Sequence, residues 1–330
     1  MLTYRESPLK DPFHYIYSSR GWLTDYDPPG PFPFFLNLEP TNVCQLNCLF
    51  CSRQLSTRKL GYLSLELASA IFIEAGNFSG AAVRFTGWGE PLLHPEILEL
   101  TQLAKQNGLK IKIYTNGLAL TPKMMEGFVS MGLDELQFSL QGLNPLQYEA
   151  NRRGASYSKL EKNIHLAAQI RGAAAQPFLS ILTSVLADEL DSGDPQAFTK
   201  KFLPYVDKVA IDFTNLNFVK AAPQVLPHLK RQSGELHRGK CVDVFLALEI
   251  KYDGTIQFCG QDANNLSSHS VGTFGEISLH EAWKSSKMEA QRNLVGRALG
   301  HAESPVCRDC YHNTTKYDLF KKALHQKSLN

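Results

Sequence analysis

The chain has 330 residues, of which 43% are hydrophobic and 20% are charged, and its formal net charge is +2. This composition provides enough apolar material for a large core, and the small net charge excludes a general attraction to nucleic acid or to a membrane surface. Residues 1–8 lack the apolar segment of a secretory signal peptide, and the longest weakly polar run, 173–187, is too short to span a bilayer. We therefore expect a cytoplasmic protein that binds neither nucleic acid nor a membrane.

Segments with strand-like sequences alternate with helical segments over residues 34–213. Strands are predicted at 34–39, 82–85, 110–114, 135–140, 178–185 and 208–213, and helices at 64–76, at 95–107, from 121 onward, and at 158–170. Strand–helix alternation implies parallel pairing with right-handed crossovers. The pattern predicts an α/β fold, a partial (β/α)6 TIM-like barrel with its reactive mouth at the carboxyl ends of the strands. A doubly wound open sheet has the same local signals and remains the alternative.

The pattern changes after the sixth predicted strand. Residues 223–240 are typical of a linker, and a hairpin that turns at Asp253-Gly254 and a helix at 278–299 are predicted beyond it. We therefore expect three parts. They are an irregular N-terminal extension at 1–33 that packs against the barrel, the barrel itself at 34–222, and a smaller domain at 223–330.

Seven cysteines in a chain without an export signal favour metal binding over disulfides. Three of them, Cys44, Cys48 and Cys51, lie together directly after the first predicted strand. Thiolates are the usual ligands of a 4Fe–4S cluster, and three of them leave one iron open to a cofactor or a substrate. A zinc site or chance clustering is the alternative. Zinc normally takes four protein ligands, and no further Cys or His lies close by in the sequence to complete them.

The other four cysteines form a second group, Cys241, Cys259, Cys307 and Cys310, and the last two have CxxC spacing. Two of them flank the predicted hairpin and two come from one tight turn, so the intervening loops can close around a single metal centre. Four thiolates saturate either a zinc ion or a 4Fe–4S cluster. The spacing alone does not choose between these two.

The first cysteine group, with Phe50 directly before Cys51, resembles the cluster loop of the radical S-adenosylmethionine (SAM) enzymes. The run from Cys241 through Gly254 to Cys259 resembles the start of the SPASM and twitch extensions of that superfamily. Four cysteines fit the shorter twitch type with one fully ligated auxiliary cluster. The layout is similar to that of 2-deoxy-scyllo-inosamine dehydrogenase. This resemblance implies two 4Fe–4S clusters, one that binds SAM and one that is auxiliary.

The resemblance also implies a set of SAM-binding residues at the predicted strand ends. Residues 86–91 resemble the family's GGEP element, with Trp88 in place of its first glycine, and residues 139–142 resemble its SxDG element with an amide in place of the acid. Each of these residues also has a purely structural interpretation. Glu90 could interact with the dipole of a nearby helix, Asn116 could form a turn, and Arg152 could be solvated. The implied cofactor-binding residues are Phe50, Gly89, Glu90, Thr115, Asn116, Ser139, Gln141 and Arg152.

The resemblance implies reductive cleavage of SAM to a 5′-deoxyadenosyl radical, which takes a hydrogen from the substrate. A saturated auxiliary cluster can only pass electrons, so we expect oxidation of a small carbohydrate-like metabolite with that cluster as the acceptor. An electron donor such as flavodoxin or ferredoxin is the expected partner. The proton acceptor is expected near Glu39, Asp212 or Glu249, and no catalytic residue is assigned.

Two other functions remain open at this point. Many relatives modify ribosomal peptides, so a maturase that cross-links or epimerises a peptide substrate is the first alternative. Only about 33 residues precede the first predicted strand, too few for an independent peptide-recognition domain. The alternative of another class is a zinc-stabilised binding protein without enzymatic activity.

Overall fold

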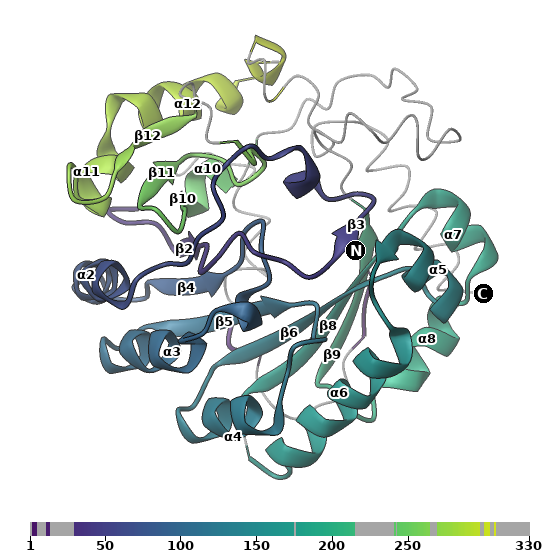
Figure 1. Ribbon diagram of the computed structural model, residues 1–330. Helices are drawn as coiled ribbons and strands as arrows, with labels where there is room; N and C mark the ends of the chain where they lie inside the picture. Colours follow the sequence, from purple (N-terminus) through teal and green to yellow (C-terminus); the bar gives the residue numbers. More distant parts are fainter. Residues whose placement is uncertain are drawn as a thin grey trace.

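The computed structural model describes residues 2–4, 11–13, 30–174, 176–214, 241, 243–264, 269–297, 300–303 and 307. Cys310 and the predicted linker lie outside these residues. Among them, no helix is both long enough and apolar enough to cross a membrane. One sheet of ten strands dominates the molecule, and helices cover its outer side (Figure 1).

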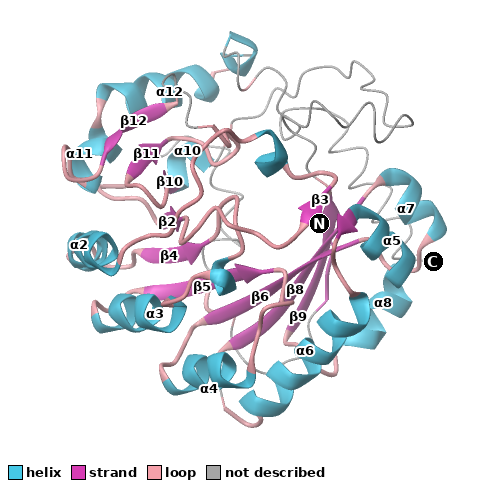
Figure 2. Cartoon of the chain, in the orientation of Figure 1, coloured by secondary structure: helices cyan, strands magenta, loops and turns pink. Residues whose placement is uncertain are grey.

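Six strands of this sheet are parallel and follow one another in chain order. They are β2 (Phe35–Leu38), β4 (Ala82–Phe85), β5 (Lys110–Thr115), β6 (Glu135–Gln141), β8 (Phe178–Val185) and β9 (Lys208–Phe213). A doubly wound sheet reverses its strand order at a switch point, and this sheet does not. The predicted partial barrel is therefore confirmed, and Figure 2 shows these strands arranged in one curved sheet.

Helices connect successive strands on the outside of the curved sheet, as crossovers between parallel strands require (Figure 2). Side-chain caps start two of them: Ser64 accepts a hydrogen bond from the Leu67 amide, and Thr121 from the Met124 amide. The helices over this region are α2 (Leu65–Gly76), α3 (Ile97–Gln106), α4 (Pro122–Ser130), α5 (Pro145–Asn151), α6 (Tyr157–Arg171), α7 (Ala187–Ser192) and α8 (Pro195–Phe202).

The alternation of side chains along each strand separates two hydrophobic clusters. Leu36 belongs to the main core together with Ile71 and Phe72 of α2, whereas its neighbour Phe35 belongs to a small second cluster. That second cluster consists of Phe13, Phe35, Ala82 and Ala247, and Phe13 is completely buried in it. The apolar layer therefore closes the end of the barrel interior at which these strands begin.

The N-terminal residues contribute both a strand and this closure. β1 (Leu2–Tyr4) pairs antiparallel with β9, so the expectation of an irregular extension was wrong for these residues. Asp11 forms an ion pair with Lys208, with 2.6 Å between Oδ2 and Nζ, and Lys110 donates to the Pro12 carbonyl at 3.3 Å. Residues 11–13 are thereby fixed against the barrel.

The C-terminal residues continue the barrel sheet instead of starting a separate one. β10 (Ala247–Ile250) pairs parallel with β2, and the predicted hairpin joins it to β11 (Thr255–Gln257), which pairs with β12 (Ser270–Thr273). Gly254 has a φ of +85°, a conformation that glycine adopts without strain. Helix α10 (Asp243–Leu246) precedes β10.

The helix predicted at 278–299 is in fact two helices, α11 (Leu279–Lys284) and α12 (Ser286–Gly296). Ser285 lies between them with an extended backbone, and its side chain accepts a hydrogen bond from the Met288 amide. The break allows Trp283 and Met288 both to be fully buried. The prediction of one continuous helix was wrong. Serine is found both at the start of helices and inside them, so Ser285 alone did not reveal the break.

Candidate active site

The first cysteine loop lies over the carboxyl ends of the barrel strands. Within it, β3 (Asn47–Cys48) pairs antiparallel with the two-residue β7 (Arg152–Arg153), and the Leu49 amide donates to the Asn151 carbonyl at 2.9 Å. Arg53 donates to the Leu46 carbonyl at 2.8 Å. A loop without regular structure is thus held in one shape by bonds to the segment that follows β6.

Burial raises the pKa of all three thiols in this loop, Cys44, Cys48 and Cys51, and the charges of neighbouring thiolates raise it further. Arg152 and Arg53 oppose this rise at Cys48. In the described part of the chain, no three His, Cys, Asp or Glu side chains lie close enough to hold a single metal ion. The donor set is three grouped sulfur atoms with cations nearby, which fits a cluster whose irons each take one thiolate.

The turn at residues 86–91 is bound directly to the cysteine loop. A Cβ atom on Gly89 would lie 2.1 Å from the Thr41 carbonyl oxygen, so only glycine lets the two segments approach this closely. The Glu90 amide donates to the Val43 carbonyl at 2.8 Å, and the Trp88 amide donates to Glu39 Oε1 at 3.1 Å. The backbone path of this turn is therefore kept despite Trp88.

Glu90 joins the end of β4 to the end of β5. Its Oε1 accepts hydrogen bonds from the Thr115 hydroxyl at 2.6 Å and the Leu92 amide at 3.0 Å, and its Oε2 accepts from the Asn116 amide at 2.7 Å. Burial raises the pKa of this carboxyl, and these donors oppose the rise. The structure thus brings together Glu90, Thr115 and Asn116, three of the predicted cofactor-binding residues. The bond to Leu92 also caps a short 3₁₀ helix, Pro91–Leu93, so the helix-terminus alternative holds as well.

Asn116 connects β5 to the cysteine loop. Its side-chain oxygen Oδ1 accepts a hydrogen bond from Gln45 Nε2 at 3.0 Å. Its side-chain nitrogen Nδ2 donates to Gln45 Oε1 at 3.4 Å and lies 4.0 Å from Cys44 Sγ. Asn116 also accepts from the Leu118 amide, which is the turn role that its Asn-Gly sequence indicated. Gln45 was not foreseen, because nothing but its place between two cysteines distinguishes it.

Gln141, at the end of β6, is buried and donates to the protein itself. Its Nε2 donates to the Thr214 hydroxyl at 2.6 Å and to Glu189 Oε2 at 3.3 Å, so these donors are already used. Its Oε1 is buried and has no hydrogen-bond partner among the described residues. Ser139, two residues earlier on the same face of β6, is half-buried. Glu189 gave no sequence signal, since it comes from α7.

Arg152 is buried between the cysteine loop and β6, which argues against the solvated alternative. Its Nη2 donates to the Leu140 carbonyl at 3.1 Å, and its guanidinium carbon lies 5.5 Å from the centroid of the Phe50 ring. The side chain is 8% exposed. Phe50 and Arg152 therefore contact each other directly beside Cys51.

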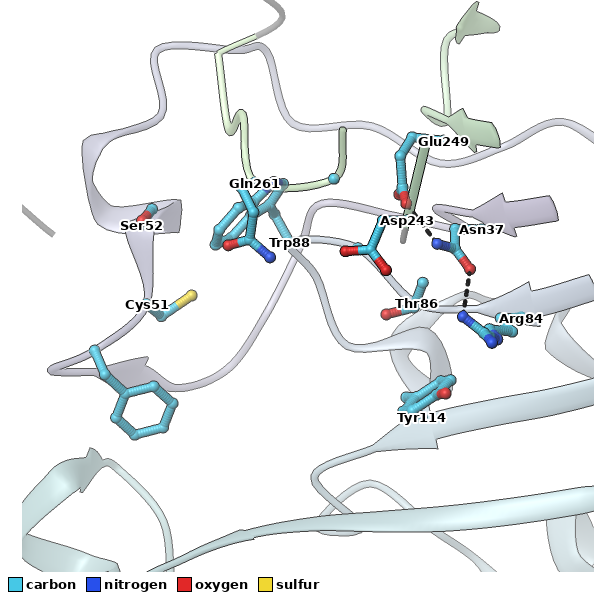
Figure 3. A pocket seen from close by; sticks show the side chains of 13 residues that line it. Asn37, Cys51, Ser52, Arg84, Thr86, Trp88, Tyr114, Asp243, Glu249 and Gln261 are labelled. Atoms are coloured by element: carbon cyan, nitrogen blue, oxygen red, sulfur yellow. Dashed lines mark hydrogen bonds between the residues drawn. The ribbon is translucent and has the colours of Figure 1, made fainter. Parts of the chain in front are cut away.

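A cavity of about 530 Å³ opens between the cysteine loop, the strand ends and the C-terminal domain. Figure 3 shows polar and aromatic side chains directed into it from all three parts. Of the three acids expected near the mouth, Glu249 lines the cavity, whereas Glu39 is held by Arg58. The lining residues are Asn37, Phe50, Cys51, Ser52, Arg84, Thr86, Gly87, Trp88, Tyr114, Asp243, Glu249, Gly260 and Gln261.

The second cysteine group is described at three of its four positions. Cys241 and Cys259 are half-buried and Cys307 is buried, and all three contact the main hydrophobic core. Gln291 Nε2 donates to Cys307 Sγ and the Gln261 amide donates to Cys259 Sγ, each at 3.5 Å. Cys310 lies outside the described residues, so the four-thiolate site stays a prediction.

Comparisons with known proteins agree with this geometry. A model of the radical SAM superfamily matches residues 38–174, and a model of the SPASM iron–sulfur cluster-binding domain matches residues 241–311. BtrN in complex with AdoMet and 2-DOIA has a TM-score of 0.58 at 16% identity, covering 85% of this chain and 93% of its own. Native anSMEcpe with bound AdoMet has a TM-score of 0.62 at 16% identity, covering 85% of this chain and 88% of its own.

Curated relatives match a shorter region. PqqA peptide cyclase of Ruegeria pomeroyi is 32% identical over 43% of this chain and 37% of its own length. The dTDP-4-amino-4,6-dideoxy-D-glucose ammonia-lyase of Streptomyces venezuelae is 32% identical over 44% of this chain and 31% of its own. The match thus spans about a third of each of these relatives.

The cysteine loop and the matched models indicate domains of a class that binds iron–sulfur clusters and SAM. Residues 38–174 match the radical SAM superfamily, and residues 241–311 match the SPASM type of iron–sulfur cluster-binding domain. The resemblance inferred from the sequence is therefore confirmed, and the enzyme is favoured over the zinc-stabilised binding protein.

Proposed function

We propose that this enzyme oxidises a small hydroxylated metabolite and that the second cluster accepts the electron. The observation that carries this proposal is the position of the cavity. It touches Cys51 of the first cysteine loop on one side, and on the other it touches Gly260 and Gln261, which directly follow Cys259. A substrate in this space would lie between the two cluster loops, as an oxidation that uses both of them requires.

We assign the cofactors to the residues predicted from the sequence. Cys44, Cys48 and Cys51 would hold the first 4Fe–4S cluster, and when bound, this cluster and SAM supply a 5′-deoxyadenosyl radical. SAM would lie against the hydrogen-bonded group of Glu90, Thr115 and Asn116, against Ser139 and Gln141, and against the Phe50–Arg152 pair. Cys241, Cys259, Cys307 and Cys310 would hold the auxiliary cluster.

The chain's own residues orient the substrate and exclude water. Trp88 and Phe50 supply apolar surface to the cavity wall, while Thr86, Tyr114 and Gln261 supply hydrogen-bonding groups for hydroxyls. The substrate would lose one hydrogen atom to the radical, one electron to the auxiliary cluster and one proton to a basic group. The net change is the loss of two hydrogens. A cytoplasmic location and reduction by flavodoxin or ferredoxin are part of the proposal.

A peptide maturase is the second candidate, and the comparisons favour it specifically. A curated relative is named a PqqA peptide cyclase, and Streptococcus suis SuiB bound to its precursor peptide SuiA has a TM-score of 0.55 with this chain, which it covers to 87%. A cavity that opens at the barrel mouth could admit one side chain of a peptide. The product would then carry a new bond or an inverted centre.

The test begins with anaerobically purified protein. Two cubic clusters require about eight irons per chain, and dithionite with SAM should yield methionine and 5′-deoxyadenosine. Cys48→Ala should abolish this cleavage, and a product lighter than its substrate by two hydrogens would support the oxidation. Solvent deuterium uptake without a mass loss would indicate epimerisation, and a cross-linked peptide would indicate the maturase. Protein that binds iron but never cleaves SAM would overturn both candidates.

A further inference from the structure

Two carboxylates line the cavity on the side of the C-terminal domain. Glu249 comes from β10 and Asp243 from the first turn of α10. Figure 3 shows both carboxylates directed into the same space, close to Asn37 and Thr86. Neither residue is one of the expected cluster ligands or of the predicted SAM-binding residues.

The sheet register holds Glu249 in place. It lies opposite Asn37 of the neighbouring strand β2, and Asn37 Nδ2 donates a short hydrogen bond to Glu249 Oε1. Arg84 Nη1 in turn donates to Asn37 Oδ1 at 3.5 Å. Oε2 accepts no hydrogen bond from a described residue. A Cβ atom on Gly260 would lie 2.7 Å from this oxygen, so a larger residue there would close the space in front of it.

Asp243 leaves the cavity with an excess of negative charge. It is exposed, and its carboxylate makes no hydrogen bond or ion pair within the described ranges. Burial and the charge of Asp243 raise the pKa of Glu249, and Lys251, Asn37 and Arg84 oppose that rise. Among the described lining residues the charged ones are these two acids and Arg84. Lys251 acts on Glu249 from outside the lining, so within the lining one arginine faces two carboxylates, and a ligand with a positive charge would complete it.

We infer that this cavity takes a hydroxylated small molecule that carries a primary amine, with the ammonium group held between Glu249 and Asp243. An ammonium group has three donors, and it would supply the partner that Glu249 Oε2 lacks. A hydrogen bond to a charged group is also stronger than a neutral one. The inference deepens the proposed function, on which it rests, because it names the class of substrate.

The chemistry of the site disfavours an anionic substrate. A carboxylate placed near Asp243 and Glu249 would meet two like charges, and Arg84 is already hydrogen-bonded toward Asn37. A neutral polyol could use the hydroxyl-binding groups but would leave the negative charge unbalanced. The lysine side chain of a peptide carries the same ammonium group, and the experiment below distinguishes it.

The experiment compares three six-carbon polyols that differ at one end. D-glucamine carries an amine, D-sorbitol a hydroxyl and D-gluconate a carboxylate. Isothermal titration calorimetry with anaerobic, cluster-loaded, SAM-bound enzyme at neutral pH measures each dissociation constant. We expect D-glucamine to bind about tenfold more tightly than D-sorbitol, which corresponds to one charged hydrogen bond. D-gluconate should bind most weakly.

Variants identify the groups responsible. Glu249→Gln keeps an acceptor for Asn37 but removes the charge, and it should abolish the preference for D-glucamine over D-sorbitol. Asp243→Asn, at an exposed position where folding is not at risk, should reduce the preference. Glu126→Gln, an exposed residue of α4 remote from the cavity, is the matched control and should leave it unchanged.

Three outcomes would overturn the inference. They are equal binding of D-glucamine and D-sorbitol, tighter binding of D-gluconate, and no saturable binding of D-glucamine. Tighter binding of N-acetyl-lysine amide than of D-glucamine would reject the small-molecule class in favour of a peptide. SAM cleavage is measured on the same samples, so failure of the amine site is distinguished from failure of the proposed radical chemistry.

Discussion

The guanidinium group of Arg58 donates hydrogen bonds to both carboxylate oxygens of Glu39, with Nη1 at 3.2 Å from Oε1. Both side chains are buried, at 7% and 1% exposure. Glu39 also accepts from the Trp88 amide at 3.1 Å and from the Tyr252 amide at 3.4 Å. One carboxylate therefore joins the end of β2, the turn at 86–91, the segment after the cysteine loop and the C-terminal hairpin.

Arg58→Met should destabilise the protein by about 3–5 kcal/mol, because it leaves the buried Glu39 carboxylate without its counter-ion. The double variant Arg58→Met/Glu39→Gln should recover part of this loss, since no unpaired charge remains. Urea unfolding of both single variants and the double variant measures the coupling. Single-variant losses below about 0.5 kcal/mol would show that the pair is not a structural junction.

Gly89→Ala should greatly weaken SAM binding. The added Cβ atom would lie 2.1 Å from the Thr41 carbonyl, so the turn at 86–91 and the segment before the cysteine loop must separate. The control is Gly80→Ala, where a φ of +84° adds backbone strain but no atom lies within 4 Å of the added Cβ. Equilibrium dialysis with labelled SAM compares the two variants. Equal affinities would contradict the role given to this contact.

Asp11→Asn should lower stability at pH 7 by about 1–3 kcal/mol, and the difference should shrink as the pH falls below the unfolded pKa. Burial acts to raise the pKa of Asp11, but the hydrogen bond and charge of Lys208 outweigh it, so the folded pKa lies below the ordinary value. The carboxylate therefore stabilises the fold above the unfolded pKa of about 3.9, and this contribution is lost as pH falls through the folded pKa.

Chemical denaturation of wild type and Asp11→Asn across this pH range measures that difference. Glu126→Gln, which removes an exposed carboxyl of α4, serves as the control. A loss of the same size at pH 2 and pH 7 would mean that the ion pair with Lys208 is not its cause.

Cys307→Ala should distinguish the roles of the two clusters. Iron content should fall from about eight to about four per chain, because the auxiliary cluster loses one of its four ligands, while SAM cleavage continues. Cys48→Ala should lose a similar amount of iron and all cleavage. Iron and acid-labile sulfide assays with 5′-deoxyadenosine analysis provide the readouts. Loss of cleavage in both variants would contradict the proposed division of labour.

Several elements could be predicted from the sequence because each has a local signal. The strands at 82–85, 178–185 and 208–213 occur with the predicted bounds, as β4, β8 and β9. Buried parallel strands are continuous apolar runs, which makes them easy to recognise. The spacing of Cys44, Cys48 and Cys51 is a local signal of the same kind, and the superfamily match agrees with the resemblance that it carried.

Other features depend on partners that are distant in the sequence. The pairing of β10 with β2 joins residues more than 200 positions apart. A hairpin motif identifies the two strands that it connects, but it does not identify the strand that pairs with their other edge. The cavity is similar, since Asn37, Arg84 and Glu249 come from three strands. Glu189 binds Gln141 only because α7 folds back over β6. Such contacts follow from the tertiary fold and leave no trace in the spacing of residues.

The placement of β10 against β2 has a consequence for any attempt to divide the protein. A fragment that ended at residue 222 would expose the backbone donors and acceptors of β2 along a buried, apolar strand. An unprotected edge of this kind is a template for aggregation. The two cluster-binding regions are thus distinct in motif but joined as one cooperative folding unit, and truncation should yield inclusion bodies instead of a smaller working enzyme.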